Sequence, residues 1–164
     1  MGIITIIGTD LVGKTTIAKG LAKTLNYKYY HEGPPPKNII TVKDYTEYWE
    51  DILIKNGNKT IYDRSFYCEI PYSEVLKRNC LIDRKSMYIL EKLMKQLCPP
   101  QEVTVIWVVA NPQLIRKRYD LRGDDLLNYE QIIKIQKLYR NIIKESLLNV
   151  SVLEVGNEFK GKNI

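Results

Sequence analysis

Apolar residues along the 164-residue chain occur in two patterns, short strand-like runs and longer stretches with helical spacing. Unbroken β-branched runs are typical of strands buried in a parallel sheet, and apolar positions three or four apart indicate amphipathic helices. The runs predict strands at 3–7, 27–31, 59–63, 103–110 and 150–155. The spacing predicts helices over about 16–25, 45–55, 66–78 and 84–97, and two more that begin after Asn111 and Asn128. Strands that alternate with helices predict an α/β fold of three layers, a five-stranded parallel sheet flanked by helices.

The segment that follows the first predicted strand matches the phosphate-binding pattern G-x-x-x-x-G-K-[ST] from Gly8 to Thr15. A glycine loop between a strand and a helix N-terminus binds anions, because its backbone N–H groups converge and the helix dipole favours negative charge. Lys14 adds a positive charge for the β- and γ-phosphates. The residues expected to bind the nucleoside triphosphate are Gly8, Thr9, Asp10, Leu11, Val12, Gly13, Lys14, Thr15 and Thr16.

A carboxylate ends the strand predicted at 59–63, and an arginine follows it directly. Asp63 is placed as a magnesium ligand, and the Thr15 hydroxyl is the second expected protein ligand. Arg64 would lie beside the same site, where it can hold a second anion. The alternative is an ordinary surface ion pair between Asp63 and Arg64.

Two further arginines lie in a basic segment near the end of the helix that starts after Asn111. Arg118 and Arg122 are four residues apart, so they project from one helix face. Arginines on a lid around 116–128 can cover a triphosphate, neutralise the transferred phosphoryl group and exclude water. The alternative is a solvated basic helix end that complements its own dipole.

Length, charge and cysteine content agree with a small protein that binds nucleotides. The chain is long enough for one domain, 1–164, with a substantial core. The net charge of +6 fits a protein that handles polyanions, whether nucleotides or nucleic acid. Three cysteines without metal-ligand spacing indicate reduced thiols and a cytoplasmic location. The apolar run at the N-terminus is too short to span a membrane.

Three stretches of the chain resemble the thymidylate-kinase-like branch of the P-loop nucleoside and nucleotide kinases. They are the phosphate loop with Asp10 at its third position, the pair Asp63-Arg64, and the helix and lid that run from Asn111 through Arg118 to Arg122-Gly123. The resemblance implies a P-loop kinase fold, ATP and Mg²⁺. It also implies transfer of the γ-phosphate to a deoxynucleoside monophosphate, such as dTMP or a modified pyrimidine nucleotide.

The same resemblance implies roles for individual residues. Asp10 corresponds to the residue that reaches the acceptor sugar or phosphate, and Arg64 to the arginine that holds the acceptor phosphate. Arg118 and Arg122 correspond to lid and adenine-side groups. The wall against which the acceptor base stacks would be formed by Phe66, Tyr67 and Tyr72. Aromatic rings in this segment fit the protein core equally well.

The acceptor remains open, because the chain departs from the family pattern after its second predicted strand. Thymidylate kinases usually have Arg-Glu-Pro there, whereas this chain has His31-Glu32-Gly33. Glu32 occupies the place of the general base that deprotonates a 5′-hydroxyl in deoxynucleoside kinases. Against that reaction, deoxynucleoside kinases typically have no aspartate at the position of Asp10 and have a glutamate at the position of Asp63.

Two more distant alternatives remain. A kinase that acts on a base or an end within DNA would use the basic surface, although nucleic acid is not the favoured partner. An NTP-dependent switch or binding module would need a guanine-specificity motif such as Asn-Lys-x-Asp, and the sequence contains none. A small-molecule nucleotide is the expected partner, no membrane partner is expected, and a homodimer stays open.

Overall fold

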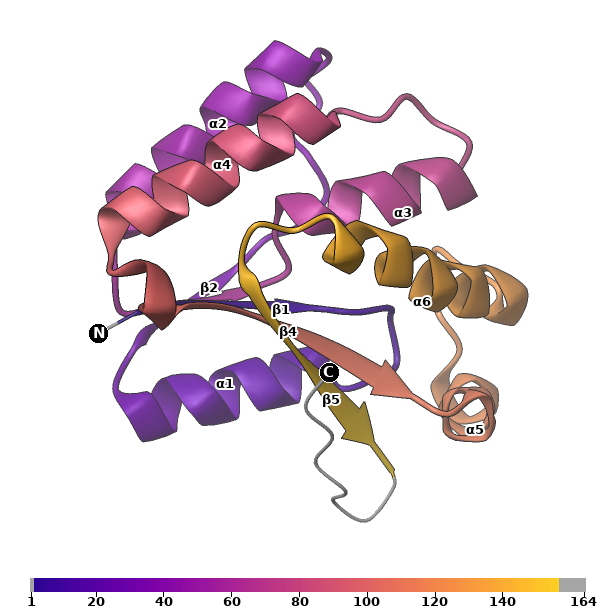
Figure 1. Ribbon diagram of the computed structural model, residues 1–164. Coiled ribbons are helices and arrows are strands. Elements are labelled where there is room, and N and C mark those ends of the chain that lie inside the picture. The colour runs from indigo at the N-terminus through magenta and orange to yellow at the C-terminus, as the bar shows by residue number, and fades with distance from the viewer. Residues whose placement is uncertain (1, 157–164) are drawn as a thin grey trace.

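The computed structural model describes residues 2–156, which form a parallel sheet between two layers of helices (Figure 1). The five strands lie in the order β2-β3-β1-β4-β5. Their bounds are β1 Ile3–Ile7, β2 Lys28–His31, β3 Thr60–Asp63, β4 Val103–Ala110 and β5 Asn149–Val155. The predicted α/β class and the five parallel strands are therefore confirmed.

Helices cover both faces of this sheet. Helix α1 (Lys14–Leu25) lies on one face, and α2 (Val42–Asn56), α3 (Glu69–Val75), α4 (Arg84–Leu97) and α6 (Tyr129–Lys144) lie on the other (Figure 1). Helix α5 (Pro112–Arg122) follows the carboxyl end of β4. Short 3₁₀ turns, η1 (Phe66–Cys68) and η2 (Pro100–Glu102), precede α3 and β4. No helix in residues 2–156 is long and apolar enough to cross a membrane.

Local sequence signals fix the starts of α2, α5 and α6. Thr41 and Asp44 form a reciprocal capping box at the start of α2, with both side chain–backbone distances at 3.1 Å. Asn128 and Gln131 form the same box at the start of α6. Asn111 caps α5 directly before Pro112, which needs no hydrogen-bond partner at the first helical position.

The helix predicted over 66–78 is shorter than expected. Pro71 lacks the N–H that an α-helix would pair with the carbonyl four residues earlier, so 66–68 form a tighter 3₁₀ turn instead. Helix α3 then ends at Val75, and Lys77 has the left-handed φ of 54°. This early end turns the chain back toward α3, which brings Arg78 close to Glu69.

The strand order places functional segments together at the carboxyl edge of the sheet. Strand β1 is central and pairs with both β3 and β4, so the chain leaves it at a point where the connections diverge to the two sides. Ile6 lies in register with Asp63, and Asp63 with His31. The ends of β1, β3 and β2 thus bring the phosphate loop, Asp63 and Glu32 to one edge.

Candidate active site

The phosphate loop joins β1 to α1 and packs directly against β4. Gly8 has φ 146°, and a side-chain carbon there would lie 2.4 Å from the Val108 carbonyl oxygen, so only glycine fits. Gly13 (φ 95°) and Leu11 (φ 67°) also have left-handed backbones. Such a turn directs backbone N–H groups inward at the first turn of α1, which is the geometry of an anion site.

Lys14 is buried at the mouth of this loop. Its Nζ donates to the Thr9 carbonyl and lies 3.5 Å from Asp10 Oδ1. Burial lowers the pKa of Lys14, and the Asp10 carboxylate only partly opposes that effect. A buried ammonium with a carbonyl as its main partner gains strongly from a phosphate oxygen.

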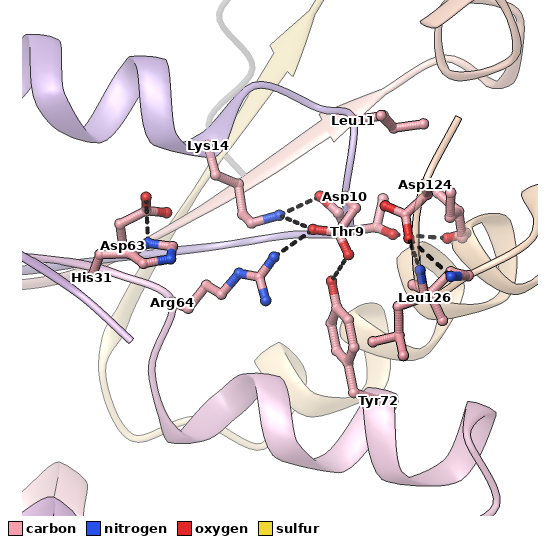
Figure 2. A network of polar contacts seen from close by, with 12 residues as sticks. Thr9, Asp10, Leu11, Lys14, His31, Asp63, Arg64, Tyr72, Asp124 and Leu126 are labelled. Atoms are coloured by element: carbon pink, nitrogen blue, oxygen red, sulfur yellow. Dashed lines mark hydrogen bonds and ion pairs between the residues drawn. The ribbon is translucent and has the colours of Figure 1, made fainter. Parts of the chain in front are cut away.

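Asp10 receives side chains from several elements (Figure 2). Arg64 Nη2 lies 2.7 Å from Asp10 Oδ1, and the Tyr72 hydroxyl donates to Oδ2 at 2.7 Å. Burial raises the pKa of Asp10, but the charges of Lys14 and Arg64 outweigh it, so the net shift is downward. Asp10 is therefore an ionised carboxylate that holds two cations at the phosphate loop.

Arg64 pairs with Asp10 and does not form the surface ion pair with Asp63 that was the alternative from sequence. Its backbone has φ 73°, which is costly for a residue with a side chain and turns the guanidinium toward the phosphate loop. Burial disfavours the charged guanidinium, yet Asp10 raises its pKa overall. The backbone conformation and the ion pair both fix this arginine.

Asp63 is fully buried beside Thr15. Its Oδ2 accepts from the Tyr29 hydroxyl at 2.8 Å and from His31 Nδ1 at 3.0 Å, whereas Oδ1 has no hydrogen-bond partner within residues 2–156. Burial raises the pKa of Asp63, but the nearby polar groups of Thr15, Tyr29 and His31 outweigh that effect, so the net shift is downward. An ionised carboxylate with one unpartnered oxygen, beside a hydroxyl, fits Mg²⁺, which binds through few protein ligands plus water and phosphate oxygens.

A cavity of about 400 Å³ opens beside Arg64 on the α2 and α3 side of the sheet. The loop after β2, the α2 helix, the η1–α3 segment and the turn at Leu126 all contribute to it. Glu32 lines the cavity at the end of β2, and its two carboxylate oxygens accept from the hydroxyls of Tyr30 and Tyr48, each at 2.6 Å. The cavity is large enough for a small organic ligand.

The predicted aromatic wall divides between the cavity and the core. Tyr72 lines the cavity, whereas the Phe66 and Tyr67 rings are fully buried. Phe66 stacks on Tyr67 with ring centres 4.4 Å apart and meets Trp49 edge-on at 5.7 Å. The core role, one of the two interpretations from sequence, therefore describes Phe66 and Tyr67, because the 3₁₀ turn directs both rings inward.

An ion pair between a buried carboxylate and an exposed arginine in the cavity wall was not anticipated from sequence. Glu69 is 3% exposed, its Oε2 accepts from Arg78 Nη2 at 2.7 Å, and its Oε1 accepts from the Leu81 backbone N–H at 3.0 Å. The only signal was an acid and a base nine residues apart, which is not a helical spacing. The early end of α3 creates the contact.

The two lid arginines differ in position. Arg118 is half-buried, and its Nη1 donates to the Leu11 carbonyl at 2.6 Å, so it reaches the phosphate loop from α5. Arg122, four residues later, is exposed at the end of the helix. Asp124 then accepts from the backbone N–H groups of Leu126 and Leu127, and this turn presents Leu126 to the cavity (Figure 2).

This arrangement, with a phosphate loop after a central strand and an Asp-Arg pair after its neighbour, is the fold of the P-loop nucleoside and nucleotide kinases. Solved structures confirm that fold. Deoxyadenosine kinase from M. mycoides, solved with the products dCMP and dCDP, is 18% identical with a TM-score of 0.61, over 95% of this chain and 91% of that chain. Thymidylate kinase from Ehrlichia chaffeensis is 15% identical with a TM-score of 0.52, over 97% of this chain and 89% of that one.

The chain is also similar to YorR from Bacillus subtilis, an uncharacterized protein derived from the SPbeta prophage. The sequences are 25% identical over 170 residues, which cover 95% of this chain and 90% of YorR. The YorR structure, solved in complex with phosphorylated GDP, has a TM-score of 0.79 at 22% identity over 94% of this chain and 86% of that chain. No protein-family model matches the chain. These similarities establish the fold, and the reaction must be argued from the site.

Proposed function

We propose that the protein is an ATP-dependent kinase that transfers the γ-phosphate to a deoxynucleoside monophosphate, such as dTMP or a modified pyrimidine nucleotide. On the donor side, the backbone of the phosphate loop and Lys14 would bind the triphosphate. Thr15 and Asp63 would hold Mg²⁺, which when bound would neutralise negative charge on the triphosphate.

The observation that carries the acceptor assignment is the position of Arg64. Its guanidinium is bound to Asp10 of the phosphate loop and also lines the cavity, so it lies between the two substrates' expected places. An arginine can bind two oxygens of a phosphate dianion at once. An incoming acceptor phosphate would share Arg64 with Asp10 and thereby approach the γ-phosphate.

With a phosphorylated acceptor, transfer would need no strong base. An oxygen of the acceptor phosphate carries no proton at neutral pH, so it can attack the γ-phosphorus directly. The new bond forms between that oxygen and phosphorus, the bond to the β–γ bridging oxygen breaks, and ADP leaves with that oxygen's charge. Lys14 and Arg64 would stabilise the charge as it redistributes over the phosphoryl oxygens.

We assign the segment 116–128 to a lid over the donor. Arg118 already contacts the Leu11 carbonyl of the phosphate loop and could transfer that contact to a bound triphosphate. Arg122 lies on the same helix and would reach the nucleotide only after the segment moves inward. Closure would exclude water, which protects ATP from hydrolysis.

A deoxynucleoside kinase is the second candidate, and Glu32 favours it. Its carboxylate lines the cavity at the edge of the sheet where the phosphate loop also lies, so it could take the proton of a 5′-hydroxyl. The hydroxyls of Tyr30 and Tyr48 hold this carboxylate in place. The same residue thus supports a different acceptor at the same cavity.

A screen of acceptors distinguishes these reactions. ADP release and product formation would be measured with ATP, Mg²⁺ and, separately, each deoxynucleoside monophosphate, each deoxynucleoside and DNA with free ends. The proposal predicts a deoxynucleoside diphosphate from at least one monophosphate. Phosphorylation of deoxynucleosides alone would select the second candidate, and phosphorylation of DNA alone would assign the basic surface to substrate binding. Nucleotide binding without transfer to any acceptor would indicate a switch or binding module.

A further inference from the structure

Side chains on the two faces of the edge strand β2 donate hydrogen bonds to two different carboxylates, those of Asp63 and Glu32. Tyr29 and His31 project from the face of the sheet that α1 covers, where the ammonium of Lys19 lies 5.6 Å from the Tyr29 ring centre. Both side chains donate to the same oxygen of Asp63. Tyr30 projects from the opposite face and donates to Glu32. Because side chains alternate along a β-strand, Tyr29 and His31 face Asp63 near the phosphate loop, and Tyr30 faces Glu32 at the cavity.

The contacts of Tyr29 and His31 leave the two Asp63 oxygens with different numbers of hydrogen-bond partners. Oδ2 accepts two hydrogen bonds, and Oδ1, which is also buried, has no hydrogen-bond partner in the described part of the chain. A buried carboxylate oxygen without a partner is costly unless a ligand completes it. Asp63 ends β3 beside β1, whose own end leads into the phosphate loop and Thr15, so this open oxygen lies at the edge of the sheet where the loop begins.

We propose that Tyr29 and His31 are positioning residues that lock the Asp63 carboxylate with Oδ1 directed at the divalent cation. This inference rests on the magnesium assignment to Thr15 and Asp63 under the proposed function. It concerns the metal and is independent of the acceptor. Without its two donors the carboxylate could rotate and exchange its oxygens, so the open oxygen would no longer be held in place.

The chemistry of the two residues suits this role. The Tyr29 hydroxyl donates a hydrogen bond to the Asp63 carboxylate at 2.8 Å, because a carboxylate can only accept. His31 is 45% exposed, so core packing does not account for it. Its Nδ1 carries the proton in this contact, because an ionised carboxylate can only accept. Donors to metal-ligating groups typically change metal affinity about 10–100-fold when removed.

Binding of Mn²⁺, followed by its electron paramagnetic resonance signal in the presence of ADP, tests the proposal without catalysis. The variants are Tyr29→Phe, His31→Leu, the double variant and Asp63→Asn. Tyr27→Phe is the matched control. The Tyr27 hydroxyl, directly before β2, also takes part in a hydrogen bond, but it accepts from the Gly2 backbone N–H, away from the site. His31→Asn retains an N–H donor near the position of Nδ1.

The proposal predicts that the double variant weakens Mn²⁺ binding about tenfold or more. ADP affinity measured in EDTA and the melting temperature should stay near the wild-type values, Tyr27→Phe should match wild type, and His31→Asn should recover much of the loss caused by His31→Leu. Unchanged Mn²⁺ affinity in the double variant would overturn the proposal. Unchanged Mn²⁺ affinity in Asp63→Asn would also overturn it, because that result would show that Asp63 is not a metal ligand. Failure of every monophosphate acceptor in the acceptor screen would instead contradict only the proposed reaction.

Discussion

Under the proposed function, the phosphate loop is the donor half of the site and the cavity beside Arg64 is the acceptor half, and these two regions are built in different ways. One continuous segment, from Gly8 to the first turn of α1, forms the phosphate loop, and its main groups are backbone N–H groups and Lys14. The acceptor cavity instead combines side chains from the loop after β2, α2, the η1–α3 segment and the turn after α5. A backbone site needs a local sequence, whereas a side-chain site depends on how distant segments pack.

This contrast also separates what each half can specify. The phosphate loop recognises an element that all nucleoside triphosphates share, so it defines a class of donor. Arg64 pairs with the Asp10 carboxylate at the loop, and the carboxylates of Glu32 and Glu69 line the same cavity as Arg64. Under the proposed function, the placement of charge around Arg64 would select the acceptor.

The largest expected effect is on the donor half. Lys14→Ala removes the charge next to the reacting phosphates, so kcat should fall about 10²–10³-fold, or about 3–4 kcal/mol of transition-state stabilisation. Lys23→Ala, in the last turn of the same helix, is the matched control and should behave as wild type. Near-normal turnover of a folded Lys14→Ala protein would contradict the kinase assignment.

Asp10 and Glu32 test the acceptor half, since each supports a different acceptor. With a monophosphate acceptor, Asp10→Ala should damage acceptor use strongly, because Arg64 and Tyr72 lose their common partner, and Glu32→Ala should be milder. With a nucleoside acceptor, Glu32→Ala should lower kcat about 10²–10⁴-fold, as expected for a lost general base. Steady-state kinetics of both variants with both acceptors would show which substitution costs more activity. A larger loss in Glu32→Ala than in Asp10→Ala with monophosphate acceptors would exclude the preferred reaction.

The lid arginines provide a smaller effect with an internal control. Arg118→Ala should raise the KM for ATP and lower kcat about tenfold, because this guanidinium already reaches the phosphate loop. Arg122→Ala should have the smaller effect unless the lid closes far enough to bring this exposed residue to the nucleotide. Equal losses in the two variants would indicate such a closure, and a larger loss in Arg122→Ala would reverse the assignment.

The smallest expected effect concerns the dependence of stability on pH. The pKa of Asp10 is lowered in the folded protein, so its ionised form stabilises the fold above the unfolded value of 3.8, and this contribution is lost as pH falls through the lower folded pKa. Asp10→Asn should lower the melting temperature at pH 6 by on the order of 5 °C. The difference should shrink as the pH falls below 3.8, where the unfolded chain takes up the proton before the folded protein does. A constant difference from pH 6 to pH 3 would assign the effect to packing.

The fold was largely predictable from sequence, because apolar runs and capping residues act locally. The strand over Val103–Ala110 and the helix over Arg84–Leu97 have the expected bounds. The segment after Arg64 was predicted less well, since the effect of Pro71 on the helix start was overlooked. Its two rings, Phe66 and Tyr67, carry no pattern that separates a cavity wall from a core.

The site was predictable only where a motif is continuous. The phosphate loop and Asp63-Arg64 could be identified directly, but the partner of Arg64 could not, because Asp10 lies 54 residues earlier and the contact depends on the backbone turn at Arg64. The contacts of Glu69 with Arg78, and of Glu32 with Tyr30 and Tyr48, were missed for the same reason. Each depends on where a neighbouring element ends or packs.

The most direct test of the central claim, that Arg64 holds a phosphorylated acceptor, is steady-state kinetics of Arg64→Lys with ATP and acceptor varied separately. Lysine keeps the charge but loses the planar pair of donors that binds two phosphate oxygens. The account predicts a KM for the deoxynucleoside monophosphate that rises about tenfold or more, with a nearly unchanged KM for ATP. Unchanged acceptor KM and kcat in a folded Arg64→Lys protein would contradict the account and leave Arg64 as a structural partner of Asp10.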